Sequence, residues 1–172
     1  METLEKMKNF PFKAINPDTN KEETFWYSRS MAVCITVFAR NTEGLFCILA
    51  NKRGPGCPDF VGYWVCPCGY LDFNETTKEA AARECYEETG VKLPVESIEF
   101  VGYEDSINSN RQNVTFRFSI CLNETVETTN DNNEGKETTD IKWIPVKDID
   151  NYKWAFGHKD LIINNGRKYS DK

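Results

Sequence analysis

Three glutamates near the middle of the chain, Glu84, Glu87 and Glu88, are spaced so that they could act together. In a helix, which turns by about 100° per residue, Glu84 and Glu88 are one turn apart and Glu87 lies beside both. Carboxylates on one helical face repel one another, and the sequence places no lysine among these three. A divalent cation would neutralise this acidic triplet, and all-oxygen ligation suits Mg²⁺ or Mn²⁺ rather than Zn²⁺. The spacing therefore predicts a metal site on one helix.

The residues around the acidic triplet are suited to support such a site. Arg83 could orient a carboxylate through a bidentate pair, and Glu75 could add a ligand or hold Arg83. Gly69 would let the backbone approach a ligand or the helix closely. By itself, however, a run of glutamates on a helix is more often a solvated face than a metal site.

The helix that carries the triplet is expected at residues 77–89. Thr76 and Glu79 form a capping-box pattern at its start, and Gly90 follows it, where a left-handed stop is expected. A run of alanines within it favours helix formation. The signals at both ends therefore agree on its length.

Strands are expected on both sides of this helix. Nearly continuous apolar residues at 31–40 predict a strand buried on both faces, which a turn joins to a second strand at 45–50. Further strands are expected at 98–103, 114–122 and 141–144, and a last helix at 155–164. This order predicts an α/β fold, a sandwich around a mixed sheet. We expect one domain at residues 30–166, after an N-terminal extension at 1–29 with an edge hairpin as one option, and before a short tail at 167–172.

The complete spacing resembles the Nudix box. In that family the pattern is Gly, five residues, Glu, seven residues, and then Arg-Glu-aliphatic-x-Glu-Glu-x-Gly-aliphatic. Here Gly69 and Glu75 lead to the run RECYEETGV at 83–91, and all seven polar and glycine positions are filled. Cys85 replaces the usual aliphatic residue, a mild departure because buried cysteine behaves as a small hydrophobe. Weaker similarity extends over most of residues 31–165.

The resemblance implies a fold, an activity and roles for these residues. The fold would be an α/β/α sandwich, and the acidic triplet, with Gly69 beside it, would bind one or more Mg²⁺ or Mn²⁺ ions supported by Glu75 and Arg83. The reaction would be water attack on phosphorus in the diphosphate linkage of a nucleoside diphosphate linked to a second group, or of a nucleoside triphosphate. The sequence signatures of particular substrate subclasses are not found, so the substrate class stays open.

The general base varies in this family, and several residues are candidates. A glutamate of the box could serve, or a glutamate of the loop before the last strand, where Glu134 and Glu137 stand. For each loop glutamate, a solvated acidic loop is the slightly better expectation.

Residues outside the box are candidates for substrate binding. Arg53 could meet a phosphate, Gly69 could let the backbone approach the substrate, and Tyr103 and Phe156 could stack on a base, although most such aromatic residues are core. His158, the single histidine, is more readily explained by a structural role at the last helix than by substrate contact.

Composition limits the remaining options. The net charge of −6 disfavours binding to a nucleic-acid backbone, so a small nucleotide derivative is the expected partner. No export signal or apolar run of about 20 residues is found, which predicts a cytoplasmic protein with reduced thiols and no membrane contact. Zinc at Cys57, Cys66 and Cys68 is not favoured, because no paired Cys-x-x-Cys or fourth ligand is evident.

Other readings of the chain are less favoured. A homodimer is expected only by analogy with the family. A weakly catalytic module that senses a nucleotide is the main alternative, although retention of every box carboxylate and the short segment after residue 165 argue against it. A structural interaction protein with an acidic helix would leave the spacing of the box unexplained.

Overall fold

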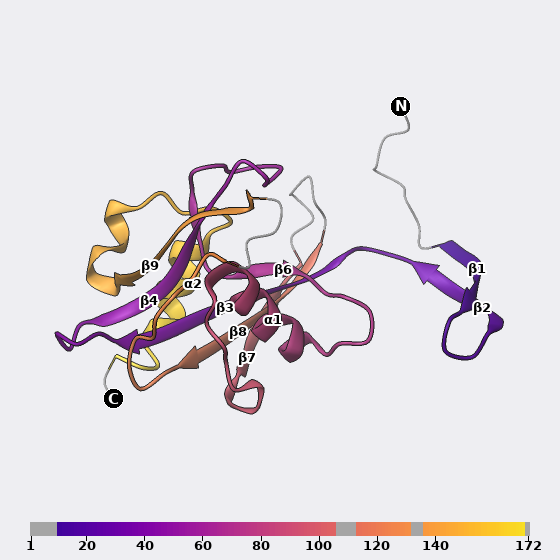
Figure 1. The fold of residues 1–172 in the computed structure, drawn as a ribbon, viewed down its shortest axis with the longest axis horizontal. Helices are drawn as coiled ribbons and strands as arrows, with labels where there is room; N and C mark the ends of the chain where they lie inside the picture. Colours follow the sequence, from indigo (N-terminus) through magenta and orange to yellow (C-terminus); the bar gives the residue numbers. More distant parts are fainter. Residues whose placement is uncertain (1–9, 106–112, 132–135, 171–172) are drawn as a thin grey trace.

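A mixed β-sheet forms the centre of the protein (Figure 1) in a computed structural model that describes residues 10–105, 113–131 and 136–170. Its strands follow the order β5-β4-β3-β8-β7, with β6 also paired to β3 and β9 to β4. Strand β3 runs parallel to β8 and antiparallel to β4 and β6. The strands are β3 (Met31–Arg40), β4 (Phe46–Arg53), β5 (Trp64–Val65), β6 (Cys68–Tyr70), β7 (Glu99–Glu104), β8 (Val114–Cys121) and β9 (Thr138–Pro145).

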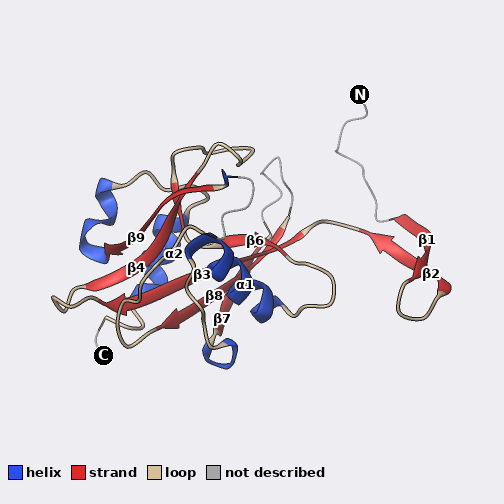
Figure 2. Ribbon diagram, in the orientation of Figure 1, coloured by secondary structure: helices blue, strands red, loops and turns tan. Residues whose placement is uncertain are grey.

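Strand β3 is buried on both faces, as its apolar sequence predicts. Val33, Ile35 and Val37 alternate on one face, where they pack with residues of helix α1 (Thr77–Thr89). Cys34 and Phe38 point to the other face, toward helix α2 (His158–Gly166). Figure 2 shows the two helices on opposite sides of the sheet, which confirms the predicted α/β/α sandwich.

Helix α1 begins and ends where its sequence signals predict. The Thr76 hydroxyl accepts a hydrogen bond from the Glu79 N–H, and the Glu79 carboxylate accepts one from the Thr76 N–H, which completes the capping box. Gly90 ends the helix in the left-handed region, with φ of 74°, and donates its N–H to the Tyr86 carbonyl. The orientation of the glutamates on this helix is therefore fixed at both ends.

One strand was not predicted, and the bounds of several elements differ from the sequence predictions. Strand β6 was not expected, because Pro67 reads as an interruption, yet its carbonyl accepts from the Ile35 N–H and continues the pairing with β3. Strand β9 begins at Thr138, three residues before the predicted start. Helix α2 begins only at His158, because Phe156 and Gly157 adopt positive φ values of 56° and 70°. Short 3₁₀ helices occupy Val95–Ser97 and Val146–Asn151.

The N-terminal extension contains the predicted hairpin, formed by β1 (Phe10–Asn16) and β2 (Lys21–Tyr27). These two strands form a sheet of their own and are not paired with the central sheet. In Figure 1 this sheet projects away from the rest of the protein. Across the described residues, no helix has the length and apolar character needed to cross a membrane.

Candidate active site

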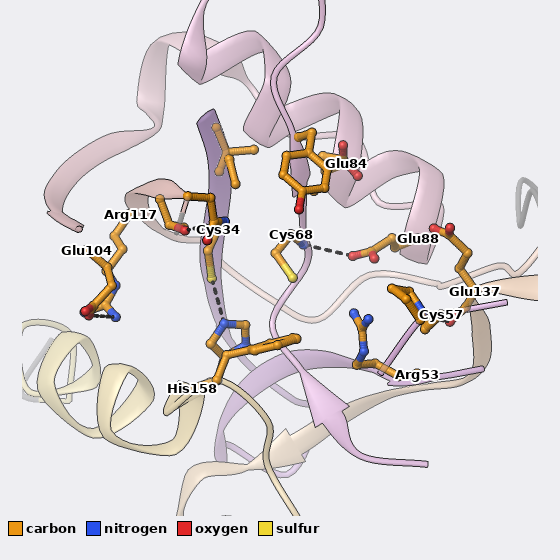
Figure 3. Close-up of a pocket in the computed structure, with 18 of the residues that line it drawn as sticks. Cys34, Arg53, Cys57, Cys68, Glu84, Glu88, Glu104, Arg117, Glu137 and His158 are labelled. Atoms are coloured by element: carbon orange, nitrogen blue, oxygen red, sulfur yellow. Dashed lines mark hydrogen bonds and ion pairs between the residues drawn. The ribbon is translucent and has the colours of Figure 1, made fainter. Parts of the chain in front are cut away.

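A pocket of about 570 Å³ opens beside the acidic triplet. Glu84 and Glu88 reach it from α1, and Gly69 reaches it from β6. Figure 3 shows Glu84 and Glu88 of α1 gathered with Arg53, which lies at the end of β4. Of the residues proposed from sequence for the substrate, Arg53, Gly69 and Phe156 line this pocket, as does Glu137.

Gly69 and Glu84 are packed against each other where β6 passes α1. A Cβ atom on Gly69 would overlap the carboxylate of Glu84. The Glu84 side chain is only 13% exposed, and its burial raises the pKa of this carboxyl group. Glycine at position 69 therefore allows a buried carboxylate to lie directly on the strand.

Arg83 holds the carboxylates of the box together. Its Nε and Nη2 atoms donate to the two oxygens of Glu75 at 3.0 and 2.7 Å. Its Nη1 atom donates to Glu84 at 2.8 Å and to Glu87 at 2.9 Å, and Nη2 also donates to the carbonyl of Tyr70. The guanidinium thus offsets part of the repulsion that the sequence spacing creates, and Glu75 holds Arg83 in place.

Glu88 lies deepest among the three glutamates. Its Oε2 atom accepts a hydrogen bond of 2.9 Å from the Cys68 N–H. Burial, together with the negative charge of Glu84, raises the pKa of Glu88 to about 8, although the Cys68 hydrogen bond and the charge of Arg53 act in the opposite direction. Glu88 is therefore a carboxylate without enough positive charge around it to remain ionised easily at neutral pH.

Arg53 supplies a cation at the same pocket. Its Nε atom donates to the Asp59 carbonyl and its Nη2 atom to the Asp59 carboxylate, each at 3.0 Å. The guanidinium carbon lies 5.1 Å from the centre of the Phe156 ring. Only 8% of Arg53 is exposed, so its position is set by these contacts. Figure 3 shows it beside Glu88 and Glu137.

Glu137 is positioned by the end of β4. The Gly54 N–H donates to the Glu137 carbonyl at 2.6 Å, and a Cβ atom on Gly54 would overlap the Lys136 carbonyl. The Cys57 thiol donates to the same Glu137 carbonyl at 3.2 Å. The segment that carries Glu137 is thus tied to the loop that follows Arg53 at the end of β4, while the alternative Glu134 lies outside the described residues.

The donor set fits a divalent cation chemically. The carboxylates of Glu84, Glu87 and Glu88 are hard oxygen ligands, and Glu88 needs an additional positive charge. Within residues 10–105, 113–131 and 136–170, no three His, Cys, Asp or Glu side chains already converge as a metal-binding group. Glu87 in particular is directed to Arg83 and does not line the pocket. For a cation to bind, Glu84 and Glu87 would therefore have to give up their hydrogen bonds with Arg83 and turn toward the ion.

His158 lies at the start of α2 and also lines the pocket. Its Nδ1 atom accepts a hydrogen bond of 3.0 Å from the Cys66 N–H. The proton of the neutral ring is therefore on Nε2, which lies 3.5 Å from the Cys34 sulfur.

Tyr103 lies outside the pocket, contrary to the sequence proposal. It pairs with Phe116 across β7 and β8, and 62% of it is exposed. Because side chains alternate along a strand, it is Glu104, the next residue of β7, that reaches the pocket.

Sequence reasoning missed the side of the pocket formed by β7 and β8. Glu104, Asn113, Thr115 and Arg117 line it there. The alternation of Thr115 and Arg117 within an otherwise apolar strand is a signal that could have identified this face.

The comparisons with known proteins agree with this architecture. The NUDIX domain family model matches residues 28–164. This chain belongs to the Nudix family. Curated relatives include the RNA pyrophosphohydrolase of Cereibacter sphaeroides, which is 41% identical over 68 residues, or 40% of this chain and 38% of that protein. The chain thus matches well under half of that Nudix relative.

Several solved Nudix structures share the fold. The NUDIX domain of Shewanella oneidensis NrtR, complexed with ADP ribose, has a TM-score of 0.68 and 22% identity, over 89% of this chain and 92% of that chain. A MutT/nudix family protein from Enterococcus faecalis has a TM-score of 0.70 and 20% identity, over 90% and 67%. A bifunctional NMN adenylyltransferase/ADP ribose pyrophosphatase from Francisella tularensis, complexed with AMP and a Mn ion, has a TM-score of 0.64 and 22% identity, over 82% and 42%.

Proposed function

We propose that this Nudix protein hydrolyses the diphosphate linkage of a nucleotide derivative, either a nucleoside diphosphate linked to a second group or a nucleoside triphosphate. The observation that carries the proposal is the arrangement of Glu88 and Arg53 in one pocket. Glu88 is partly buried and short of positive charge, while Arg53 is held in place nearby by Asp59. A diphosphate bound between a cation on Glu88 and the Arg53 guanidinium would be neutralised from both sides.

The metal would be Mg²⁺ or Mn²⁺, held by Glu84, Glu87 and Glu88 next to Gly69. When bound, it would polarise the diphosphate and lower the pKa of the attacking water. The protein contributes the placement of the ligands: Gly69 admits the Glu84 carboxylate, and Arg83 keeps Glu84 and Glu87 together. A Mn ion in the Francisella structure is consistent with this choice of metal.

Arg53 and Phe156 would bind the substrate. The Arg53 guanidinium is fixed by Asp59 and by the Phe156 ring, so little side-chain entropy is lost when it binds a phosphate. Its charge would also stabilise the negative charge that develops on the leaving phosphate.

Glu137 is the proposed general base. It lines the pocket near Glu88, whose pKa its charge helps to raise, and its loop is tied to Gly54. It would accept the proton of the attacking water. If the glutamates of the box bind the metal, Glu137 is the further pocket carboxylate that lies beside Arg53 and Glu88, whereas Glu104 lies at the far end of the pocket.

The test is hydrolysis of a panel of substrates with Mg²⁺, Mn²⁺ or a chelator. The panel contains ADP-ribose, NADH, nucleotide sugars, dinucleoside polyphosphates, nucleoside triphosphates and an RNA with a 5′-triphosphate. The RNA is included because one relative is an RNA pyrophosphohydrolase, and ADP-ribose because one neighbouring structure binds it and another is an ADP ribose pyrophosphatase. Metal-dependent release of a nucleoside monophosphate or of pyrophosphate supports the proposal. Tight binding of a nucleotide without any cleavage would instead indicate a nucleotide-sensing module.

A further inference from the structure

The floor of the pocket is a sheet face on which strand pairing orders the side chains into rows. In the first row, Tyr70 of β6 pairs with Ala32 of β3. Ala32 pairs with Thr115 of β8, which pairs in turn with Glu104 of β7. All four residues line the pocket, so this row crosses the whole floor.

The adjacent row runs in the same direction, two residues along each of these strands. Cys68 of β6 pairs with Cys34 of β3, and Cys34 pairs with Arg117 of β8. Arg117 pairs with Gly102 of β7, which has no side chain to cover the guanidinium. Because neighbouring strands lie about 4.8 Å apart, the floor extends roughly 14 Å from β6 to β7. One end therefore lies beside Gly69, and the other is distant from the acidic triplet.

Small side chains form the middle of the floor. Ala32 is 7% exposed and Cys34 is 1% exposed, and the Cys34 sulfur lies 3.5 Å from Nε2 of His158, which also lines the pocket. Tyr70, with 51% of its surface exposed, is paired with Ala32 and adds an aromatic ring to the lining of the pocket. Such a surface suits the planar face of a nucleobase, which binds by stacking and apolar contact.

The distant end carries a donor and an acceptor side by side. Arg117 Nη2 donates to Glu104 Oε2 at 2.7 Å, and their side chains are 27% and 46% exposed. Among the described residues, neither of these two side chains makes another polar contact. Oε1 of Glu104 and further N–H groups of Arg117 are therefore available to a ligand. In Figure 3 the pair lies on the opposite side of Cys34 and Cys68 from Glu88 and Arg53.

Guanine is the base whose edge fits this pair most completely. Its N1–H and N2–H₂ groups can both donate to one carboxylate, and its O6 and N7 atoms can both accept from one guanidinium. Adenine offers a single amino group to the carboxylate, and uracil a single ring N–H. Adenine and the pyrimidines would therefore leave some hydrogen-bonding groups of Glu104 and Arg117 without a partner. In a partly buried site this weakens binding.

We propose that Glu104 and Arg117 read the nucleobase of the substrate and select guanine. This inference rests on the proposed function, because it assumes that the phosphates lie at the end with Glu88 and Arg53. It assigns the β7–β8 end of the pocket to the base, and it makes a guanine nucleotide the preferred substrate class. A simple cross-strand ion pair would hold β7 to β8 without affecting the choice of base.

The test is calorimetric titration of the full chain with GDP, ADP, CDP and UDP in the presence of Mg²⁺, for the wild type and for Glu104→Gln and Arg117→Gln. Glu22→Gln is the matched control, because it removes a similar cross-strand ion pair, with Lys13, in the N-terminal hairpin. We expect GDP to bind most tightly to the wild type. Glu104→Gln should weaken GDP binding by roughly 5- to 150-fold, the discrimination of a lost bidentate base contact, and change ADP binding by less than about twofold. Glu22→Gln should change neither.

Equal binding of all four nucleotides, a preference for another base, or an equal loss of GDP and ADP binding in Glu104→Gln would overturn the inference. The measurement does not require catalysis, so it separates the two proposals. Guanine-selective binding without hydrolysis would leave the inference standing and contradict the proposed function. Hydrolysis without base selectivity, which the substrate panel would reveal, would support the proposed function and contradict this inference.

Discussion

The carboxylate of Glu84 occupies the space in which a side chain at Gly69 would begin. The two residues are 15 positions apart in sequence, one on α1 and the other on β6. Glycine at this position is therefore required by the close approach of a carboxylate rather than by backbone conformation, since Gly69 does not have a positive φ.

Substitution Gly69→Ala tests this contact. We expect the Cβ atom to displace the Glu84 carboxylate and to lower metal affinity and turnover by about 10- to 100-fold, as changes around metal ligands commonly do. The measurement is activity as a function of Mg²⁺ concentration. Gly166→Ala is the control, because its Cβ would make only ordinary contact with Phe38 and should leave the metal dependence unchanged.

The raised pKa of Glu88 predicts a pH-dependent stability in the absence of metal. Folded Glu88 keeps its proton up to about pH 8, while in the unfolded chain it loses the proton near its ordinary value of 4.5. The stability that this proton contributes is fully present below about pH 4.5 and is lost as the pH rises through 8. Denaturant unfolding in chelator at pH 5.5 and 8.5 should therefore show a larger loss of stability in the wild type than in Glu88→Gln.

Added Mg²⁺ should reverse this behaviour, because the cation favours the ionised carboxylate. The free energy of unfolding of the wild type should rise on addition of Mg²⁺ at pH 8.5, and that of Glu88→Gln should rise much less. Identical pH dependence in the wild type and in Glu88→Gln would contradict the burial of an uncompensated carboxyl group.

Arg53→Gln tests the cationic side of the pocket. The substitution removes the charge that would bind the substrate phosphates, and kcat/KM should fall by roughly 100-fold, a loss of the size that mispositioned substrates produce. Asp59→Asn keeps Arg53 but weakens its anchor, so a smaller fall in kcat/KM is expected. If Arg53→Gln retained wild-type kcat/KM toward a cleaved substrate, Arg53 would have no role in phosphate binding.

Glu137→Gln tests the proposed base. The backbone carbonyl that accepts from Gly54 is retained in this variant, so the loop should keep its position. We expect kcat to fall by about 100- to 10,000-fold, the usual contribution of a general base, with little change in substrate binding. A normal kcat in this variant, together with a large loss in a glutamate of the box, would move the role of base to the box.

The sequence predicts the box because its residues are close together along the chain. Helical geometry and the two caps suffice to place Glu84, Glu87 and Glu88 on α1. The position of Arg53 at the same pocket depends on how β4 and β6 both pair with β3, which only a resemblance to known proteins suggests. Glu104 and Tyr103 illustrate the limit: adjacent residues of β7 point in opposite directions, so an uncertainty of one residue in register selects the wrong side chain.

The sequence also did not predict strand β6, and the reason is physical. It is only three residues long, contains Gly69 and follows Pro67, all of which are unfavourable signals for a strand. Its existence depends on pairing with β3, which is a tertiary contact. Because β6 brings Gly69 against Glu84, this missed element is also the one that completes the candidate metal site.

Hydrolysis of the substrate panel in ¹⁸O-labelled water, with mass spectrometry of the products, is the most direct test that this pocket uses a metal on the box glutamates to cut a diphosphate. We expect ¹⁸O in a phosphate of one product, cleavage that requires Mg²⁺ or Mn²⁺, and a loss of several orders of magnitude in kcat for Glu87→Gln. The stability of that variant should change by less than about 1 kcal/mol, because its ion pair with Arg83 is partly exposed. Cleavage that persists in chelator, or a Glu87→Gln variant with wild-type kcat, would contradict the assignment of the metal site.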